Sequence, residues 1–429
     1  MLKFYLNIFL LSIFGVLVFI DVHYYIFMPI LIALFFVNFP KLNYDNLLLF
    51  SIYTSFFGIY LSLENFPEIQ IYRLLILPIG FYILLKGLLK KQKIYLYFLM
   101  IFLYIWIHPF LVSWKGSLEN LTFTMTLLST YFVILVTYEI CKRGQINKLL
   151  TSFLLFIVCN IIVSVSEVIT SEHLIYSNIV NYTQTNLFLP TGFFFNQNDL
   201  GITLLCCLIV INIMDNKIKY NVLLNFSITI LIFIISSRTL IVCTVAFYLI
   251  LFFKNFKFRN IFKVIFIGIP FVLVILMIGT NYYDTIGSYS VEKLSNIINI
   301  FDSRNEVYAY HIKLIYEYPF GLTENMYNNL VFNKGMTNSH SLVIELTQRF
   351  GLIFIFALIA TLILFFIKNV KGNKLYIGTI LIIFFLMSNV SSSLLTGSNI
   401  VWSLTVLAIL MIVDESRLKS KYATQECNY

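Results

Sequence analysis

A histidine at a predicted helix start is the first feature of this sequence that could do chemistry. The stretch 337–342 leads into an apolar run, and Asn338 or Ser339 has the side chain of a helix N-cap. His340 would then lie in the first helical turn, where the helix dipole disfavours the imidazolium form. Because a general base must be unprotonated, His340 is the candidate catalytic base. The alternative is a surface histidine that only begins a helix.

Two arginines could supply a site for an anion. Arg238 lies between two closely spaced apolar runs, and Arg304 opens a helical stretch that ends at the turn 318–321. A guanidinium group can bind phosphate oxygens through two parallel hydrogen bonds, so both are candidate substrate ligands. The alternative is that each arginine only extends its charged end from a membrane boundary into water. A further arginine, Arg349, is expected to pair with Glu345, four residues before it.

The helix that carries Arg304 is predicted to begin at Ser303. Ser303 has the side chain of an N-cap, and Glu306 follows three residues later, as in a capping box. His311 lies seven residues after Arg304 and therefore shares its helical stripe. We expect no chemical role for His311. An amphipathic helix at the membrane surface is the alternative interpretation of the whole stretch.

A third polar segment, 192–201, contains the amide side chains of Asn196 and Asn198, which suit sugar hydroxyl groups. The three phenylalanines at 193–195 are expected to insert into the membrane interface. The alternative is a loop with an aromatic anchor and an Asn or Asp cap. The sequence contains no Asp-x-Asp pair, and no cysteine pair has metal-site spacing. We therefore expect no metal and no other cofactor.

The elements that position these residues are predicted to be membrane helices. The 429 residues are 60% hydrophobic and 11% charged, whereas a soluble domain has about 25% charged residues. A bilayer accommodates so apolar a surface and favours helices, because each helix pairs its own backbone amides. We expect an all-α, polytopic integral membrane protein with about 12–14 transmembrane helices. The fourteen candidate runs are 4–20, 24–39, 46–63, 71–86, 94–111, 121–140, 149–168, 199–214, 221–236, 239–253, 264–279, 350–367, 375–390 and 400–413.

The basic residues predict how these helices are oriented. With the N-terminus in the cytoplasm, 21 of the 29 lysine and arginine residues fall on the cytoplasmic side, as the positive-inside rule requires. That rule explains the net charge of +9 without a nucleic-acid partner. Both termini are then cytoplasmic, and one large external loop precedes the last three helices. The predicted regions are N-terminal helices 1–168, central helices with a first external loop 169–279, the large external loop 280–349, and C-terminal helices with a tail 350–429.

Four short blocks, in a fixed order, resemble the O-antigen ligase and polymerase superfamily, which includes the Wzy-type polymerases. They are 192–201, 236–239, 304–321 and 340–351. One difference is that Ser341 follows His340, where the family typically has Asn. The resemblance implies a metal-independent glycosyltransferase in the bacterial inner (cytoplasmic) membrane, whose donor is a glycan on undecaprenyl diphosphate. It would act on the outer face of that membrane.

Within this class we favour a polysaccharide polymerase that joins lipid-linked repeat units for O antigen or capsule. Its partners would be the undecaprenyl-diphosphate-linked oligosaccharide, a chain-length regulator and a flippase. One alternative is an O-antigen ligase that transfers glycan to the lipid A core. Another is a lipid-linked oligosaccharide flippase or transporter. Transporters commonly have internally repeated halves, and no repeat of fixed period is visible in the sequence.

Overall fold

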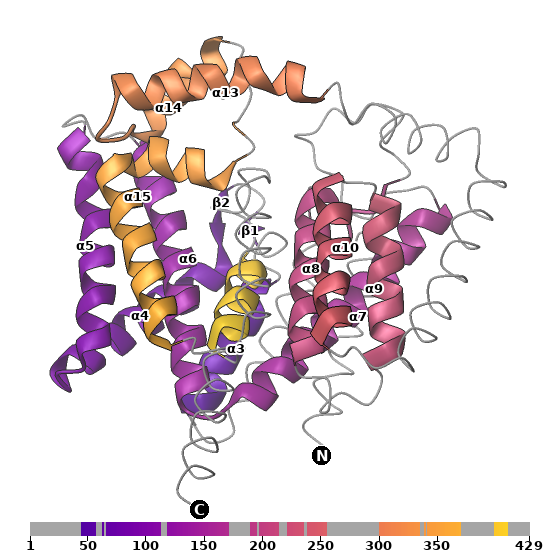
Figure 1. The fold of residues 1–429 in the computed structure, drawn as a ribbon. Helices are drawn as coiled ribbons and strands as arrows, with labels where there is room; N and C mark the ends of the chain where they lie inside the picture. Colours follow the sequence, from indigo (N-terminus) through magenta and orange to yellow (C-terminus); the bar gives the residue numbers. More distant parts are fainter. Residues whose placement is uncertain are drawn as a thin grey trace, which may run out of the picture. The chain divides into compact units, whose positions relative to one another are not determined.

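The computed structural model describes twelve stretches of the chain, drawn as coloured ribbon in Figure 1. They are 44–56, 62–63, 66–112, 118–170, 189–194, 197–213, 221–235, 238–254, 300–334, 339, 341–369 and 399–410. The chain divides into two compact units. The first comprises Met1–Val180, Pro190–Leu200 and Ser393–Leu407, and the second comprises Asn181–Leu189, Gly201–Ser392 and Ala408–Tyr429. Each unit is described by itself.

The described helices are those of a helical membrane protein. Four are long and apolar enough to cross a membrane, namely Lys93–Val112, Asn120–Lys142, Ile146–Thr170 and Leu342–Thr361. Shorter apolar helices are Leu75–Leu89, Gln197–Asn212, Val222–Ile235, Leu240–Leu251 and Asn399–Leu410. About 20 apolar residues span the hydrocarbon core of a bilayer. The predicted runs 4–20, 24–39, 264–279 and 375–390 lie outside the described residues, so the full number of spans stays a prediction.

Among the described residues of the first unit, five helices form a bundle around α6. The helices are α3 (Tyr44–Phe56), α4 (Ile71–Leu89), α5 (Lys93–Val112), α6 (Leu118–Lys142) and α7 (Ile146–Thr170). Helix α6 contacts each of the other four and is the most buried of the four long spans, whereas α5 is the least buried. The outward face of α5 carries exposed apolar side chains such as Trp106, Phe110 and Leu111. Such a face suits contact with lipid.

Two further elements belong to this unit, a short strand pair and a late helix. A short antiparallel pair, β1 (Ser62–Leu63) and β2 (Phe66–Gln70), lies between α3 and α4 in the chain. The sequence predicted a helix through position 63, so the end of that prediction is wrong and the described fold is not purely helical. The late helix Asn399–Leu410 joins α6 through a hydrogen bond of 3.0 Å from the Thr137 hydroxyl to the Ser403 hydroxyl.

The second unit contains an apolar helix group and a more polar one. Helix α8 (Gln197–Ile213) begins in the first unit and continues into the second, where α9 (Asn221–Ile235) contacts α10 (Arg238–Lys254) as the predicted tight hairpin. The polar group consists of α13 (Ile300–Glu317), α14 (Glu324–Leu330), the short 3-10 helix η4 (Phe332–Lys334) and α15 (Leu342–Asn369). Helix α13 packs against α15 (Figure 1). This polar group contains Arg304, whereas Arg238 begins α10 and Asn198 lies in α8.

Candidate functional site

Helix α13 is held on α15 by a buried histidine. His311 is fully buried, and its Nδ1 atom lies 2.8 Å from Nε2 and 3.0 Å from Oε1 of the Gln348 amide. The same Nε2 atom donates a hydrogen bond of 3.1 Å to the carbonyl oxygen of His311. The imidazole also stacks on the buried ring of Tyr327 at 6.4 Å. His311 is therefore a structural residue of the α13–α15 contact.

The turn after α13 docks on a break in α15. Gly351 has φ 82° and ψ 168° inside α15, a conformation that is essentially restricted to glycine. A Cβ atom there would lie 2.6 Å from the carbonyl carbon of Phe320 and 2.7 Å from the carbonyl oxygen of Pro319. The Leu352 amide donates to that Pro319 oxygen at 2.9 Å, and the Leu322 amide donates to the Gln348 carbonyl oxygen at 2.7 Å. Two of the four sequence blocks, 304–321 and 340–351, therefore meet here.

A buried arginine fastens α14 to the same helix. The Arg349 side chain is 5% exposed, its Cζ atom lies 3.7 Å from the centroid of the Tyr327 ring, and it forms an ion pair with Glu324. The predicted ion pair between Arg349 and Glu345 is therefore wrong, because Arg349 pairs with Glu324. Glu345 is buried, and its Oε2 atom has no hydrogen-bond partner among the described residues.

Burial also sets the ionisation of the tyrosine in this cluster. Burial first, and then the nearby carboxylate of Glu345, raise the pKa of the Tyr327 phenol well above its ordinary value. The phenol therefore stays protonated throughout the physiological range. Tyr327 therefore contributes a neutral ring to this buried cluster. The His311 imidazole stacks on that ring, and the Arg349 guanidinium lies over it.

The start of α15 differs from the prediction. Helix α15 begins at Leu342, and the Ser341 hydroxyl accepts a hydrogen bond of 3.4 Å from the Ile344 amide. Ser341 is therefore the N-cap, and the expectation of Asn338 or Ser339 is wrong. His340 consequently precedes the helix rather than occupying its first turn, so the helix-dipole argument for a neutral imidazole does not apply. His340 itself lies outside the described residues.

The two candidate arginines are placed by their helices. Arg238 is the first residue of α10, and Arg304 lies in α13, seven residues before His311. Helix α13 begins at Ile300, so the predicted N-cap at Ser303 is wrong, whereas its end at Glu317 agrees with the predicted stop at 318–321. The side chains of both arginines lie outside the described part of the structure. Their role as anion ligands stays a prediction.

The segment before α8 is anchored by two residues that the sequence reasoning missed. The Glu167 carboxylate, at the end of α7, accepts hydrogen bonds of 2.8 Å from the amides of both Thr191 and Gly192. The Asn160 side-chain oxygen accepts one of 3.0 Å from the Phe193 amide. The sequence did contain a signal for this contact, namely the acidic residue Glu167 within an apolar helix. A buried carboxylate needs hydrogen-bond donors from elsewhere in the chain.

This anchoring changes the expected role of the phenylalanines. Phe193 and Phe194 are buried and contact the ring of Phe156 on α7. The prediction that they insert into the membrane interface is therefore wrong for these two. Asn198 lies in the first turn of α8 and is half-buried, while Asn196 lies outside the described residues. The segment 192–201 is thus anchored to α7 by hydrogen bonds. The role of its two asparagines in sugar binding stays a prediction.

Comparison with known proteins does not add a family to this description. No protein-family model, no curated protein and no solved structure matches the chain. Within the stretches that the structure describes, no group of three His, Cys, Asp or Glu residues could hold a metal ion. The function must therefore be argued from the membrane helices and from the polar segments they hold.

Proposed function

We propose that the chain is a polysaccharide polymerase that joins undecaprenyl-diphosphate-linked repeat units on the outer face of the cytoplasmic membrane. The products would be O antigen or capsule. The observation that best supports this proposal is the docking of the turn at Pro319 and Phe320 on Gly351. This contact makes two separate blocks of the resemblance, 304–321 and 340–351, one structural unit.

The proposed reaction transfers a glycan from one lipid to another. The acceptor hydroxyl attacks the anomeric carbon of the donor glycan, a glycosidic bond forms, and the bond from that carbon to the diphosphate oxygen breaks. His340 takes the proton of the acceptor and later releases it to water. Arg238 and Arg304 stabilise the charge of the departing undecaprenyl diphosphate without a metal. Asn196 and Asn198 bind sugar hydroxyl groups.

Deleting the gene separates this proposal from its two rivals. A polymerase mutant should carry surface glycans of a single repeat unit, because lipid-linked repeats are still made and moved outward. Long chains that remain on the carrier lipid and never reach the lipid A core would instead indicate a ligase. Repeats that accumulate on the cytoplasmic leaflet would indicate a flippase or transporter.

Substitutions test the proposed residues. Replacing Arg by Lys keeps the charge but loses the two-pronged hydrogen bonding, so Arg304→Lys should strongly shorten the surface glycan. His340→Ala should abolish long chains while the protein still inserts, because a positioned base contributes roughly 10²–10⁴-fold in rate. Lys313→Gln is a suitable control, since Lys313 is an exposed cation on the same helix. His311→Ala is unsuitable because that residue is buried in the α13–α15 contact.

A further inference from the structure

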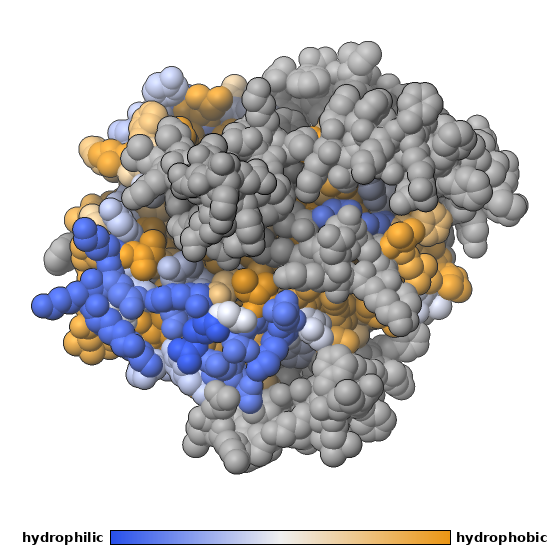
Figure 2. Space-filling view, turned by 60° about the horizontal axis from the view of Figure 1, so that its bottom comes forward, coloured by the Kyte–Doolittle hydropathy of each residue, from blue (hydrophilic) through white to orange (hydrophobic). Residues whose placement is uncertain are grey.

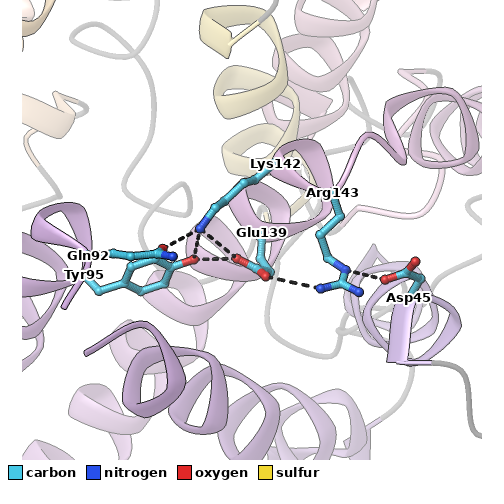
Figure 3. Close-up of polar contacts among 6 residues, drawn as sticks. All are labelled: Asp45, Gln92, Tyr95, Glu139, Lys142 and Arg143. Atoms are coloured by element: carbon cyan, nitrogen blue, oxygen red, sulfur yellow. Dashed lines mark hydrogen bonds and ion pairs between the residues drawn. The ribbon is translucent and has the colours of Figure 1, made fainter. Parts of the chain in front are cut away.

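Two basic turns meet at one end of the first unit. The α4–α5 turn contains Lys90 and Lys91, and the α6–α7 turn follows Lys142 and Arg143. The Lys142 ammonium donates a hydrogen bond of 2.6 Å to the Gln92 side-chain oxygen, which joins the two turns (Figure 3). The positive-inside rule predicts that both basic turns lie on the cytoplasmic side of the membrane.

A carboxylate organises the contact between these turns. Glu139 accepts a hydrogen bond of 2.5 Å from the Tyr95 hydroxyl, and its carboxylate lies 4.0 Å from the Lys142 ammonium and 3.8 Å from an Arg143 nitrogen. Arg143 also pairs with Asp45 at the start of α3 (Figure 3). Lys142 and Arg143 therefore already have anionic partners within the protein.

The two turns have the same backbone conformation, with one residue at positive φ, but that residue is a glycine in one turn and a lysine in the other. In the α6–α7 turn, Gly144 has φ 72° and its amide donates to the Cys141 carbonyl oxygen at 3.0 Å. In the α4–α5 turn, Lys91 has φ 51° and its amide donates to the Leu88 carbonyl oxygen at 2.8 Å. Positive φ is easy for glycine and sterically unfavourable for lysine. Lys91 is therefore less stable in its turn than the glycine used in the matching one.

The lysines around this turn are free to bind an external anion. Three of them are exposed, and no ion pair joins them to any other described residue. They are Lys90, Lys91 and Lys93. Exposed apolar side chains adjoin them, with Leu89 84% and Leu96 54% exposed. Figure 2, which brings the bottom of Figure 1 forward, shows hydrophilic residues in a band beside apolar surface.

We propose that Lys90, Lys91 and Lys93 form a binding site for the phosphate head groups of anionic phospholipids in the adjacent leaflet. The exposed apolar residues next to the lysines favour a membrane lipid, because acyl chains would cover Leu89 and Leu96 while the phosphate meets the ammonium groups. The hydrogen bond from Lys142 to Gln92 holds this turn against α6. This proposal does not depend on the proposed glycan chemistry.

The conformation of Lys91 separates this site from a simple excess of positive charge. Orientation by the positive-inside rule needs lysines near a helix end but does not need one at positive φ. A glycine at position 91 would fit the backbone better, as it does at position 144. The unfavourable backbone conformation of Lys91 is therefore consistent with a binding role for its charge at the tip of the turn.

The test uses the purified full chain in detergent, with bound lipids counted by native mass spectrometry. Dioleoyl phosphatidylglycerol and dioleoyl phosphatidylcholine are added separately, at low and high salt. Each juxtamembrane lysine contributes about a fivefold change in affinity for anionic lipid. We expect Lys91→Gly to weaken phosphatidylglycerol binding about fivefold without lowering thermal stability in phosphatidylcholine. The triple variant Lys90→Gln, Lys91→Gly, Lys93→Gln should weaken it more than tenfold.

Two controls decide whether the site is specific. Lys334→Gln removes an exposed lysine from the second unit and should leave phosphatidylglycerol binding unchanged. Inorganic phosphate at millimolar concentration should not displace the lipid. The proposal is overturned if the triple variant binds phosphatidylglycerol as the wild type does, if Lys334→Gln weakens binding equally, or if phosphate alone displaces the lipid.

Discussion

Replacing Gly351 by Ala should detach the turn 318–321 from α15. The new Cβ would lie 2.6 Å from the carbonyl carbon of Phe320 and 2.7 Å from the carbonyl oxygen of Pro319. Since both atoms belong to the backbone, no side-chain rotation can relieve the contact. The turn must move away, and the hydrogen bonds of the Leu352 and Leu322 amides should then be lost.

The size of this effect follows from three contributions. A non-glycine residue in this conformation costs on the order of 1–3 kcal/mol, and each lost backbone hydrogen bond costs about 1 kcal/mol. Gly351→Ala should therefore destabilise the α13–α15 contact by about 3–5 kcal/mol. Gly144→Ala is a matched control, because Gly144 also has positive φ but a Cβ there would meet nothing within 4 Å. That variant should cost only about 1–2 kcal/mol, and only in the first unit.

Hydrogen exchange measured by mass spectrometry can read this difference locally. A loss of about 3 kcal/mol in local stability speeds exchange by roughly 100-fold. We expect that acceleration in peptides from α13 in the Gly351→Ala protein and unchanged exchange of α13 in the Gly144→Ala protein. If α13 exchanges at the wild-type rate in Gly351→Ala, the proposed docking of the turn on α15 is incorrect.

Further predictions concern the anchors and the topology. Glu167→Gln should destabilise the first unit by about 1–2 kcal/mol, because a neutral amide accepts hydrogen bonds less strongly than a carboxylate; chemical denaturation of the purified protein would show it, with exposed Glu317→Gln unchanged. Arg349→Lys should destabilise the second unit by about 1–2 kcal/mol, because an ammonium cannot reproduce the planar stacking on the buried tyrosine; an unchanged denaturation midpoint would refute this role. A topology reporter near Asn333 should be external and one after Lys421 cytoplasmic, whereas finding both on one side would contradict the layout.

The membrane helices were predictable from the sequence because one strong physical requirement sets their length. The apolar runs 94–111, 121–140 and 149–168 correspond closely to α5, α6 and α7. The end of α13 was also predictable, since Pro319 and Gly321 cannot continue a helix. In these cases the neighbouring residues in the chain alone decide the structure.

The polar contacts were less predictable because distant residues decide them. Arg349 had a plausible local partner in Glu345, but the fold brings Glu324 to it from 25 residues away. The sequence favoured Asn338 or Ser339 as the cap of α15, whereas the Ser341 hydroxyl accepts the hydrogen bond from the Ile344 amide. Phe193 and Phe194 would suit an interface or a core equally well by type. Their buried positions follow from hydrogen bonds to Glu167 and Asn160.

Synthesis by the purified chain tests the polymerase proposal most directly. The full-length protein in nanodiscs would be incubated with undecaprenyl-diphosphate-linked repeat units in the presence of EDTA, and the products would be separated by length. The proposal predicts a ladder of glycans with two or more repeats, release of undecaprenyl diphosphate in step with each bond formed, and no ladder from His340→Ala. A wild-type protein that binds the repeats but yields only single units would contradict it.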